Sequence, residues 1–364
     1  MRTESPAGCG LIRRYLSSLP VSKKTPIITL CEGLTPLIPA PRLARKAGLL
    51  EESVYLKFEG ANPTGSFKDR GMTVAMSKAV EEGARGVLCA STGNTAASAA
   101  AYAARAGLPC LVLLPAGGVA LGKLAQSLMY GAKVLSVRGN FDQALELARD
   151  LASKDGWTLV NSTNPYRLQG QKTAAFELIE AFGRAPDFQF MPVGNAGNIT
   201  AYWMGYREHH KRSKTGLPKM MGWQAAGAAP IVLGRPVLKP KTVASAIRIG
   251  NPVSWKRAEE ARDDSHGLID KVADRDIISA YQFLASQEGV FCEPSSAAAV
   301  AGLLKFAKGG GFKNADKKKL KIACILTGNG LKDPDTPKTL RHAVTTIRPS
   351  LAELRRAMKS FKHG

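Results

Sequence analysis

Hydrophobic and polar positions along this chain form a regular succession of strand-like and helix-like segments. Short apolar runs predict strands at residues 54–59, 86–90, 111–114, 133–137, 158–160, 188–193 and 321–327. Longer segments with helical periodicity predict helices at residues 67–82, 96–106, 121–130, 141–153, 170–182 and 199–211. Strands that alternate with helices of these lengths are typical of βαβ units and a parallel sheet.

The length and the spacing of these segments indicate how the chain is organised. A chain of 364 residues is long enough for two domains with large cores. We find no internal repeat and no low-complexity linker, so the domains are expected to share an interface. The predicted fold class is therefore α/β, with two doubly wound domains and mostly parallel sheets.

The charge of the chain is strongly basic, with 51 Lys and Arg against 29 Asp and Glu and a formal net charge of +22. Such an excess raises the question of nucleic-acid binding. However, the charge is spread along the chain, aromatic residues make up only 7%, and the densest basic segments, 313–321 and 355–362, are typical of solvated surface. We therefore expect no nucleic-acid partner, and note that a positive field also attracts small anionic substrates.

Other features limit the location and the chemistry of the protein. No apolar run reaches the length of a membrane span, and the N-terminus lacks the apolar core of a secretory signal. The six cysteines are scattered without a CxxC pair, and the five histidines lack ligand spacing, so no metal site is predicted. We therefore expect no membrane partner, reduced thiols and a cytoplasmic location.

Three loops at predicted strand ends carry the candidate chemistry, because ligands of doubly wound sheets bind where strands end and helices begin. The first loop, residues 62–71, places Lys68 in the first turn of a helix. The helix dipole disfavours an ammonium group there, so the pKa of Lys68 should fall toward the range used in Schiff-base chemistry. An isolated lysine would more simply be a surface residue.

The second and third loops are suited to anions. Ser91, Thr92, Gly93, Asn94 and Thr95 offer hydroxyl, amide and backbone N–H groups at a helix N-terminus, which suits a carboxylate, although an N-cap would explain one of them. The third loop follows the apolar strand at 188–193, and two glycines with successive N–H groups make it a phosphate cradle; its residues are Gly194, Asn195, Ala196, Gly197 and Asn198.

A fourth loop, residues 117–123, has the glycine and lysine spacing of a P-loop. The next residue is Leu124, whereas a P-loop requires a Ser or Thr hydroxyl there to bind Mg²⁺. Nucleotide hydrolysis is therefore not predicted.

The three loops occur in the order SFKDRG, STGNT and GNAGN, and together they resemble fold-type II pyridoxal-phosphate enzymes, most closely the threonine synthases. Further matching segments are EGLTPL, NSTNPYRLQGQK, QAAGAAP, GVFCEPSSA and LTGNGLKDP, so that the resemblance covers about residues 8–335. It implies an active site in the cleft between a large cofactor-binding domain (residues 1–57 and 156–364) and a smaller inserted domain (residues 58–155).

The resemblance also assigns roles to the residues that would hold pyridoxal phosphate. Lys68 would link covalently to the cofactor and then act as the base that removes the substrate's α-proton. Asn94 would bond the 3′ oxygen of the ring, the loop at residues 194–198 would hold the cofactor phosphate, and Thr327 would face the pyridine nitrogen.

The same resemblance implies a second anion site, since threonine synthases act on O-phosphohomoserine. Arg167 would bind the substrate phosphate through its planar fork, with Thr95, Asn161 and Asn195 as neutral donors. Ser91 and Thr92 would hold the substrate carboxylate. A threonine or serine dehydratase remains an alternative, and a basic binding protein without activity is a remote one.

Two segments and the oligomeric state receive weaker expectations. Residues 255–275 are charged and poorly patterned, and we expect them to form a mobile cover over the site. The Lys- and Arg-rich region after residue 336 is expected to form a peripheral helix. A homodimer is expected from the resemblance alone.

Overall fold

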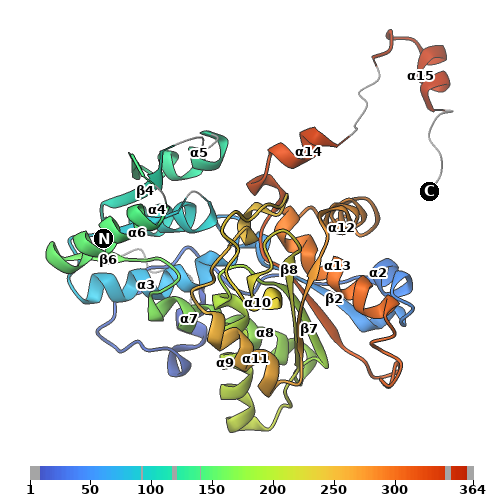
Figure 1. Cartoon of the computed structure of the whole chain (residues 1–364), viewed down its shortest axis with the longest axis horizontal. Helices are drawn as coiled ribbons and strands as arrows, with labels where there is room; N and C mark the ends of the chain where they lie inside the picture. Colours follow the sequence, from blue (N-terminus) through green and yellow to red (C-terminus); the bar gives the residue numbers. More distant parts are fainter. Residues whose placement is uncertain (1–8, 92, 117–120, 140, 341–345, 359–364) are drawn as a thin grey trace.

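The computed structural model describes residues 9–91, 93–116, 121–139, 141–340 and 346–358. Its described part contains two sheets, each with helices on both faces (Figure 1). The pairing is parallel except between the first two strands, which confirms the predicted α/β class.

The larger sheet has six strands in the described part, in the order β1-β2-β10-β7-β8-β9. Their bounds are β1 Leu37–Pro39, β2 Val54–Phe58, β7 Phe188–Pro192, β8 Lys219–Ala225, β9 Leu268–Val272 and β10 Ile322–Leu326. The central strands β7 and β10 are buried at every position, because helices cover both faces of the sheet.

Two apolar clusters cover the two faces of the larger sheet. On one face lie α2 (Pro41–Lys46), α12 (Asp274–Gln287) and α13 (Pro294–Lys308). On the other face lie α8 (Thr173–Phe182), α9 (Gly197–Ser213) and α11 (Trp255–Asp264).

The smaller sheet has four strands in the order β5-β4-β3-β6, all parallel within the described residues. They are β3 Gly86–Ala90, β4 Cys110–Pro115, β5 Lys133–Val137 and β6 Trp157–Leu159. One face packs against α3 (Lys68–Glu81), α4 (Asn94–Ala106) and α5 (Leu121–Met129), and the other against α6 (Phe141–Lys154). The division into domains at residues 58 and 155 stays a prediction.

Five further α-helices lie in the described part of the chain. They are α1 Leu11–Arg14, α7 Pro165–Gln171, α10 Pro230–Leu233, α14 Asp335–Thr339 and α15 Leu351–Met358. Helix α15 stands apart from the sheets (Figure 1) and buries none of its residues, as expected of a peripheral C-terminal helix.

Two predictions about secondary structure were wrong. The single helix predicted at residues 170–182 is two helices, α7 and α8, which meet at Lys172. The cover expected at residues 255–275 is instead α11 followed by β9, the edge strand of the larger sheet. Because β9 is an edge strand that keeps several side chains partly exposed, its charged residues conceal the strand pattern.

The reduced state expected of the cysteines stays a prediction for Cys9 and Cys31. These two residues lie side by side, with Cα atoms 5.0 Å apart. Their contact brings the segment before α1 against the loop before β1. The other four cysteines are free and buried, as small apolar residues would be.

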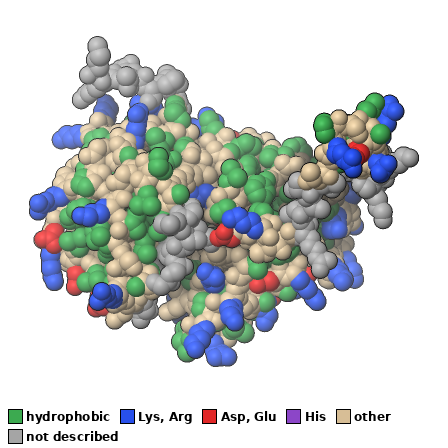
Figure 2. Space-filling model, turned by 90° about the horizontal axis from the view of Figure 1, so that it is seen from above, with side chains coloured by type: hydrophobic (Ala, Val, Ile, Leu, Met, Phe, Trp, Pro, Cys, Tyr) green, Lys and Arg blue, Asp and Glu red, His purple; other side chains and the backbone are tan. Residues whose placement is uncertain are grey.

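From the sequence, we expect the positive charge to be spread over the protein rather than concentrated in one region. Figure 2 shows Lys and Arg side chains scattered over the viewed face of the molecule rather than gathered into one patch. In the described ranges, we find no helix that is both long and apolar enough to cross a membrane.

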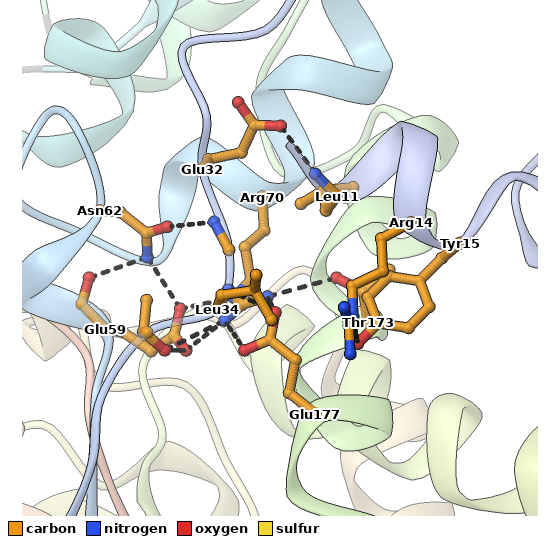
Figure 3. A network of polar contacts seen from close by, with 12 residues as sticks. Leu11, Arg14, Tyr15, Glu32, Leu34, Glu59, Asn62, Arg70, Thr173 and Glu177 are labelled. Carbon is orange, nitrogen blue, oxygen red and sulfur yellow. Dashed lines mark hydrogen bonds and ion pairs between the residues drawn. The ribbon is translucent and has the colours of Figure 1, made fainter. Parts of the chain in front are cut away.

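A buried network of charges joins the larger sheet to α3 (Figure 3). The Arg70 guanidinium donates to both oxygens of Glu59 at 2.6 and 2.8 Å and to both oxygens of Glu177 at 2.6 and 2.7 Å. The Lys57 ammonium donates to Glu177 at 2.6 Å. Burial favours the neutral form of Glu177, but Arg70 and Lys57 outweigh burial and hold its pKa at about 2. Two cations, Arg70 and Lys57, therefore neutralise two carboxylates in the interior. Arg70 belongs to α3, the helix that begins at Lys68.

Replacing Arg70 with leucine should lower the free energy of unfolding by about 3–5 kcal/mol at pH 7, because the buried Glu59 loses its cation and the buried Glu177 keeps only Lys57. Denaturant unfolding of the cofactor-free protein measures this loss. The deficit should shrink as the pH falls, since the isolated carboxyl groups then take up protons. Arg45→Leu is the control: it breaks the exposed pair with Glu51, and the expected cost is below about 1 kcal/mol. Equal effects of the two substitutions would contradict the assigned role of Arg70.

Candidate active site

The candidate residues lie where strands of both sheets end and helices begin. Lys68 is the first residue of α3, in the chain that follows β2. The backbone of the preceding residue is tied to the larger sheet, because the Phe67 N–H donates to the Thr327 carbonyl at 3.0 Å. The backbone N–H of Asn329 also donates to the Gly65 carbonyl at 2.9 Å. These bonds fix Lys68 beside the carboxyl end of β10.

The pKa of Lys68 is lowered to about 7, as the sequence predicted in direction. Burial is the largest cause, and the Arg167 guanidinium adds to it, whereas Glu293 acts in the opposite direction. The Lys68 ammonium lies 4.3 Å from the centre of the Phe67 ring. A substantial fraction of the amine is therefore neutral at physiological pH, which both nucleophilic attack and proton abstraction require.

Asp69, the next residue, anchors the Lys68 turn to the smaller sheet's helices. Its carboxylate accepts hydrogen bonds from the Thr64 N–H at 2.7 Å, the Thr64 hydroxyl at 2.6 Å and the Ser98 hydroxyl of α4 at 2.6 Å. Burial raises its pKa to about 6, although these hydrogen bonds lower it. Three donors on one buried carboxylate make the turn rigid.

The loop between β7 and α9 has the form of an anion cradle. Ala196 adopts a left-handed conformation with φ of 63°, which turns the chain into the N-terminus of α9. The side-chain Nδ2 of Asn198 is buried without a hydrogen-bond partner. An N–H group in this condition costs free energy unless an acceptor fills the site. The loop at residues 194–198 therefore suits a phosphate at a helix N-terminus.

Asn94 is the first residue of α4, and Thr327 directly follows β10 of the larger sheet. Both side chains contact a third residue, Glu293. The Asn94 Nδ2 donates to Glu293 Oε2 at 3.0 Å, and the Thr327 hydroxyl donates to Glu293 Oε1 at 3.3 Å. Thr327 also lies 3.0 Å from the Ser296 hydroxyl. Burial raises the pKa of Glu293, while Asn94, Lys332, Lys68 and Thr327 lower it. The two residues expected at the edges of the cofactor ring thus share one buried carboxyl group.

Arg167 is a buried cation, 1% exposed, that makes no ion pair in the described part of the chain. Its Nη1 donates to the Val160 carbonyl at 2.8 Å, and its Nε is buried without a partner. Burial lowers its pKa to about 10. A buried guanidinium in this condition is stabilised by any anion that reaches it.

Backbone-to-backbone packing fixes Arg167 relative to Lys68. A Cβ atom on Gly71 of α3 would lie 2.6 Å from Arg167 Nε, and one on Gly170 of α7 would fall on the carbonyl oxygen of Arg70. Glycine at both positions allows α3 and α7 to touch directly.

The other predicted substrate contacts have structural partners. Asn161 exchanges two hydrogen bonds with the Ala90 backbone, both at 2.9 Å, and so joins the ends of β6 and β3. Asn195 donates to the Ser162 hydroxyl at 3.2 Å and accepts from the Val253 N–H.

In the loop expected to hold the substrate carboxylate, the Ser91 hydroxyl accepts from the Gly93 N–H at 3.3 Å. Thr92 lies outside the described residues, and Thr95 is in the first turn of α4.

These residues fit pyridoxal phosphate on three counts. Lys68, which has a lowered pKa, lies beside the end of a strand. The N-terminus of α9 carries the buried, unpartnered side-chain N–H of Asn198. Asn94 and Thr327 both contact the Glu293 carboxyl group that lies between them. The sequence prediction did not include Glu293 or Asp69. Glu293 could have been noticed as the one acidic residue in the segment GVFCEPSSA, directly before the proline that begins α13.

Comparisons with known proteins agree with this geometry. The sequence profile of the family "Pyridoxal-phosphate dependent enzyme" matches residues 28–328. The chain therefore belongs to the family of pyridoxal-phosphate-dependent enzymes. Solved structures with the same fold include maize serine racemase, with a TM-score of 0.70 and 20% identity over 89% of this chain and 91% of that one. Tomato threonine deaminase aligns with a TM-score of 0.69 and 22% identity over 89% and 82% of the two chains.

Relatives of this chain within the family include threonine synthases. The enzyme of Halalkalibacterium halodurans is 57% identical over 327 residues, which cover 90% of each chain. The threonine synthase of Methanocaldococcus jannaschii is 48% identical over 358 residues, covering 96% of this chain and 87% of the other.

The lowered pKa of Lys68 predicts how the cofactor-free protein takes up pyridoxal phosphate. Only the neutral amine attacks a carbonyl, so the rate should rise with pH around a midpoint near 7 rather than near the ordinary lysine value of 10.5. Stopped-flow absorbance after mixing measures the rate, and a free lysine derivative provides the reference. A rate that still climbs steeply above pH 9 would contradict the assigned environment of Lys68.

Proposed function

We propose that the protein is a threonine synthase, which converts O-phospho-L-homoserine and water into L-threonine and inorganic phosphate. The observation that carries the proposal is Arg167, a buried cation with an unpartnered Nε and no acidic partner in the described part of the chain. A substrate with its own phosphate group would supply the missing anion. The threonine synthase relatives at 48–57% identity support the same substrate.

The residues of the chain divide between the cofactor and the substrate. Pyridoxal phosphate supplies an electron sink for the carbon atoms next to the substrate amine. The loop at residues 194–198 would hold its phosphate, Asn94 its 3′ oxygen and Thr327 its ring nitrogen. Lys68 would hold it covalently and, once released, take the α-proton of the substrate on Nζ.

The second anion site would hold the substrate's phosphate on Arg167, with Thr95, Asn161 and Asn195 as neutral donors. Ser91, Thr92 and the N–H groups at the start of α4 would hold the carboxylate. In the net reaction the bond between Cγ and the phosphate oxygen breaks and Cγ gains a proton. Cβ gives up one proton and takes the hydroxyl of water, whose remaining proton leaves with the released phosphate. A fixed phosphate site keeps the leaving group aligned during this step.

The decisive experiment is an assay of the purified protein with O-phosphohomoserine. We expect inorganic phosphate and threonine in equal amounts. Formation of 2-oxobutyrate from threonine as the dominant activity would overturn the proposal in favour of a dehydratase. A protein that stays colourless with pyridoxal phosphate, and in which borohydride traps no cofactor on the Lys68 peptide, would exclude both activities.

The proposal includes a homodimer in the cytoplasm. Both the dimer and the location rest on the family resemblance. Light scattering of the purified protein tests the dimer, and fractionation of the source cells tests the location.

A further inference from the structure

Lys332 is a cation beside the site that no step of the proposed reaction uses. It ends the short 3₁₀ helix η5 (Gly330–Lys332), five residues after Thr327 and the end of β10. Its aliphatic stem lies against the loop that leads to Lys68, since a Cβ atom on Gly65 would be 3.1 Å from Lys332 Cδ. Lys332 makes no ion pair with any residue that the structure describes, and its ammonium donates to Gln126 Oε1.

Gln126 continues this contact to the loop before Lys68. It lies in α5, which packs on the smaller sheet, and its Nε2 donates to the Thr64 carbonyl at 3.2 Å. The N–H and hydroxyl of Thr64 in turn donate to Asp69, the neighbour of Lys68. One side chain, Gln126, thus joins the end of β10 to the turn that carries Lys68.

The charges around Lys332 hold it in this place. Burial lowers the pKa of Lys332, whereas Glu293 and Asp69 raise it. Both carboxyl groups belong to the site, one between Asn94 and Thr327 and one beside Lys68. A neutral side chain of the same length would lose both attractions and the hydrogen bond to Gln126.

We propose that Lys332 is a positioning residue, which with Gln126 and Thr64 forms a clasp between the two sheets. The clasp holds α5 against the Lys68 loop, so that the cofactor lysine and the helices of the smaller sheet keep one arrangement during turnover. Its effect on turnover rests on the proposed function, whereas its effect on α5 does not. Gln126 contacts both Lys332 and Thr64, so removing Gln126 should have at least the effect of removing Lys332, and removing both should add nothing to the loss of Gln126.

Four variants, one of them double, and a matched control test the clasp in the cofactor-loaded protein. Lys332→Met and Gln126→Ala should each speed amide hydrogen exchange in α5, residues 121–129, and leave the bound cofactor's absorbance in place. Each should lower kcat for O-phosphohomoserine by about ten- to hundredfold with little change in KM, and the double variant should lose no more than Gln126→Ala alone. Lys332→Arg should recover part of both effects. The control Lys338→Met removes an exposed lysine of α14 and should change neither.

Hydrogen exchange tests the clasp, and the activity assay tests the proposed function, so the failure of one can be told from the failure of the other. If exchange in residues 121–129 is the same in Lys332→Met and Lys338→Met, the clasp is overturned, whatever the enzyme does with its substrate. Additive losses in the double variant would also overturn it, because the two side chains would then act independently. If instead the unaltered protein releases no phosphate from O-phosphohomoserine, the proposed function fails, and faster exchange in α5 still supports the clasp.

Discussion

Replacing Lys68 with alanine is expected to abolish turnover, with a loss of at least about 10³-fold, because the variant lacks both the covalent link and the base. Some pyridoxal phosphate should still bind without a covalent bond, since the loop at residues 194–198, Asn94 and Thr327 do not depend on the lysine. Equilibrium dialysis measures the bound cofactor, and borohydride treatment should trap none of it.

The control for this variant is Lys78→Ala, ten residues further along α3, which removes a partly buried ion pair with Glu81. It should keep normal turnover and a trappable cofactor. Partial recovery of Lys68→Ala by added methylamine would show that the missing amine is the cause. A Lys68→Ala variant with normal turnover would mean that another lysine carries the cofactor.

Replacing Arg167 with alanine is expected to separate substrate binding from cofactor binding. The bound cofactor should keep its colour, while kcat/KM for O-phosphohomoserine should fall by roughly ten- to more than hundredfold for each charge-assisted bond lost. Inhibition by free phosphate should weaken in parallel. Because Arg167 is one cause of the lowered Lys68 pKa, the pH midpoint of cofactor uptake should also move upward.

Arg167→Lys should recover only part of this loss, because a point charge keeps the attraction but not the two parallel bonds. An Arg167→Ala protein that loses its cofactor but has normal activity per bound pyridoxal phosphate would place Arg167 in the cofactor site or the scaffold. The choice of threonine synthase over dehydratase would then lose its physical support.

Several of the strands that the sequence predicted are buried on both faces. β3, β4 and β7 are nearly continuous apolar runs because helices cover them on each side. β8 (KMMGWQA) lacks β-branched residues, and β9 (LIDKV) is a charged edge strand, so neither has a clear strand pattern. Their place in the sheet is decided by tertiary packing, which local sequence does not contain.

The same limit applies to the site. Residues next to one another in a loop, such as those at 194–198, can be predicted together because one turn brings them to one ligand. The contacts of Glu293 with Asn94 and of Lys332 with Gln126 span 199 and 206 positions. Such pairs form only when the two sheets are folded against each other, so no local pattern indicates them.

The direct packing of α3 on α7 through Gly71 and Gly170 also bears on how the protein can move. The backbones of the two helices approach each other at these glycines, with the Arg167 side chain packed against Gly71, so we expect α3 and α7 to move together. The lysine that would carry the cofactor and the arginine that would bind the leaving group then lie on one unit. Any hinge that admits substrate is expected to lie outside this unit. Under the proposed function, the spacing of the two groups would favour substrates of one length.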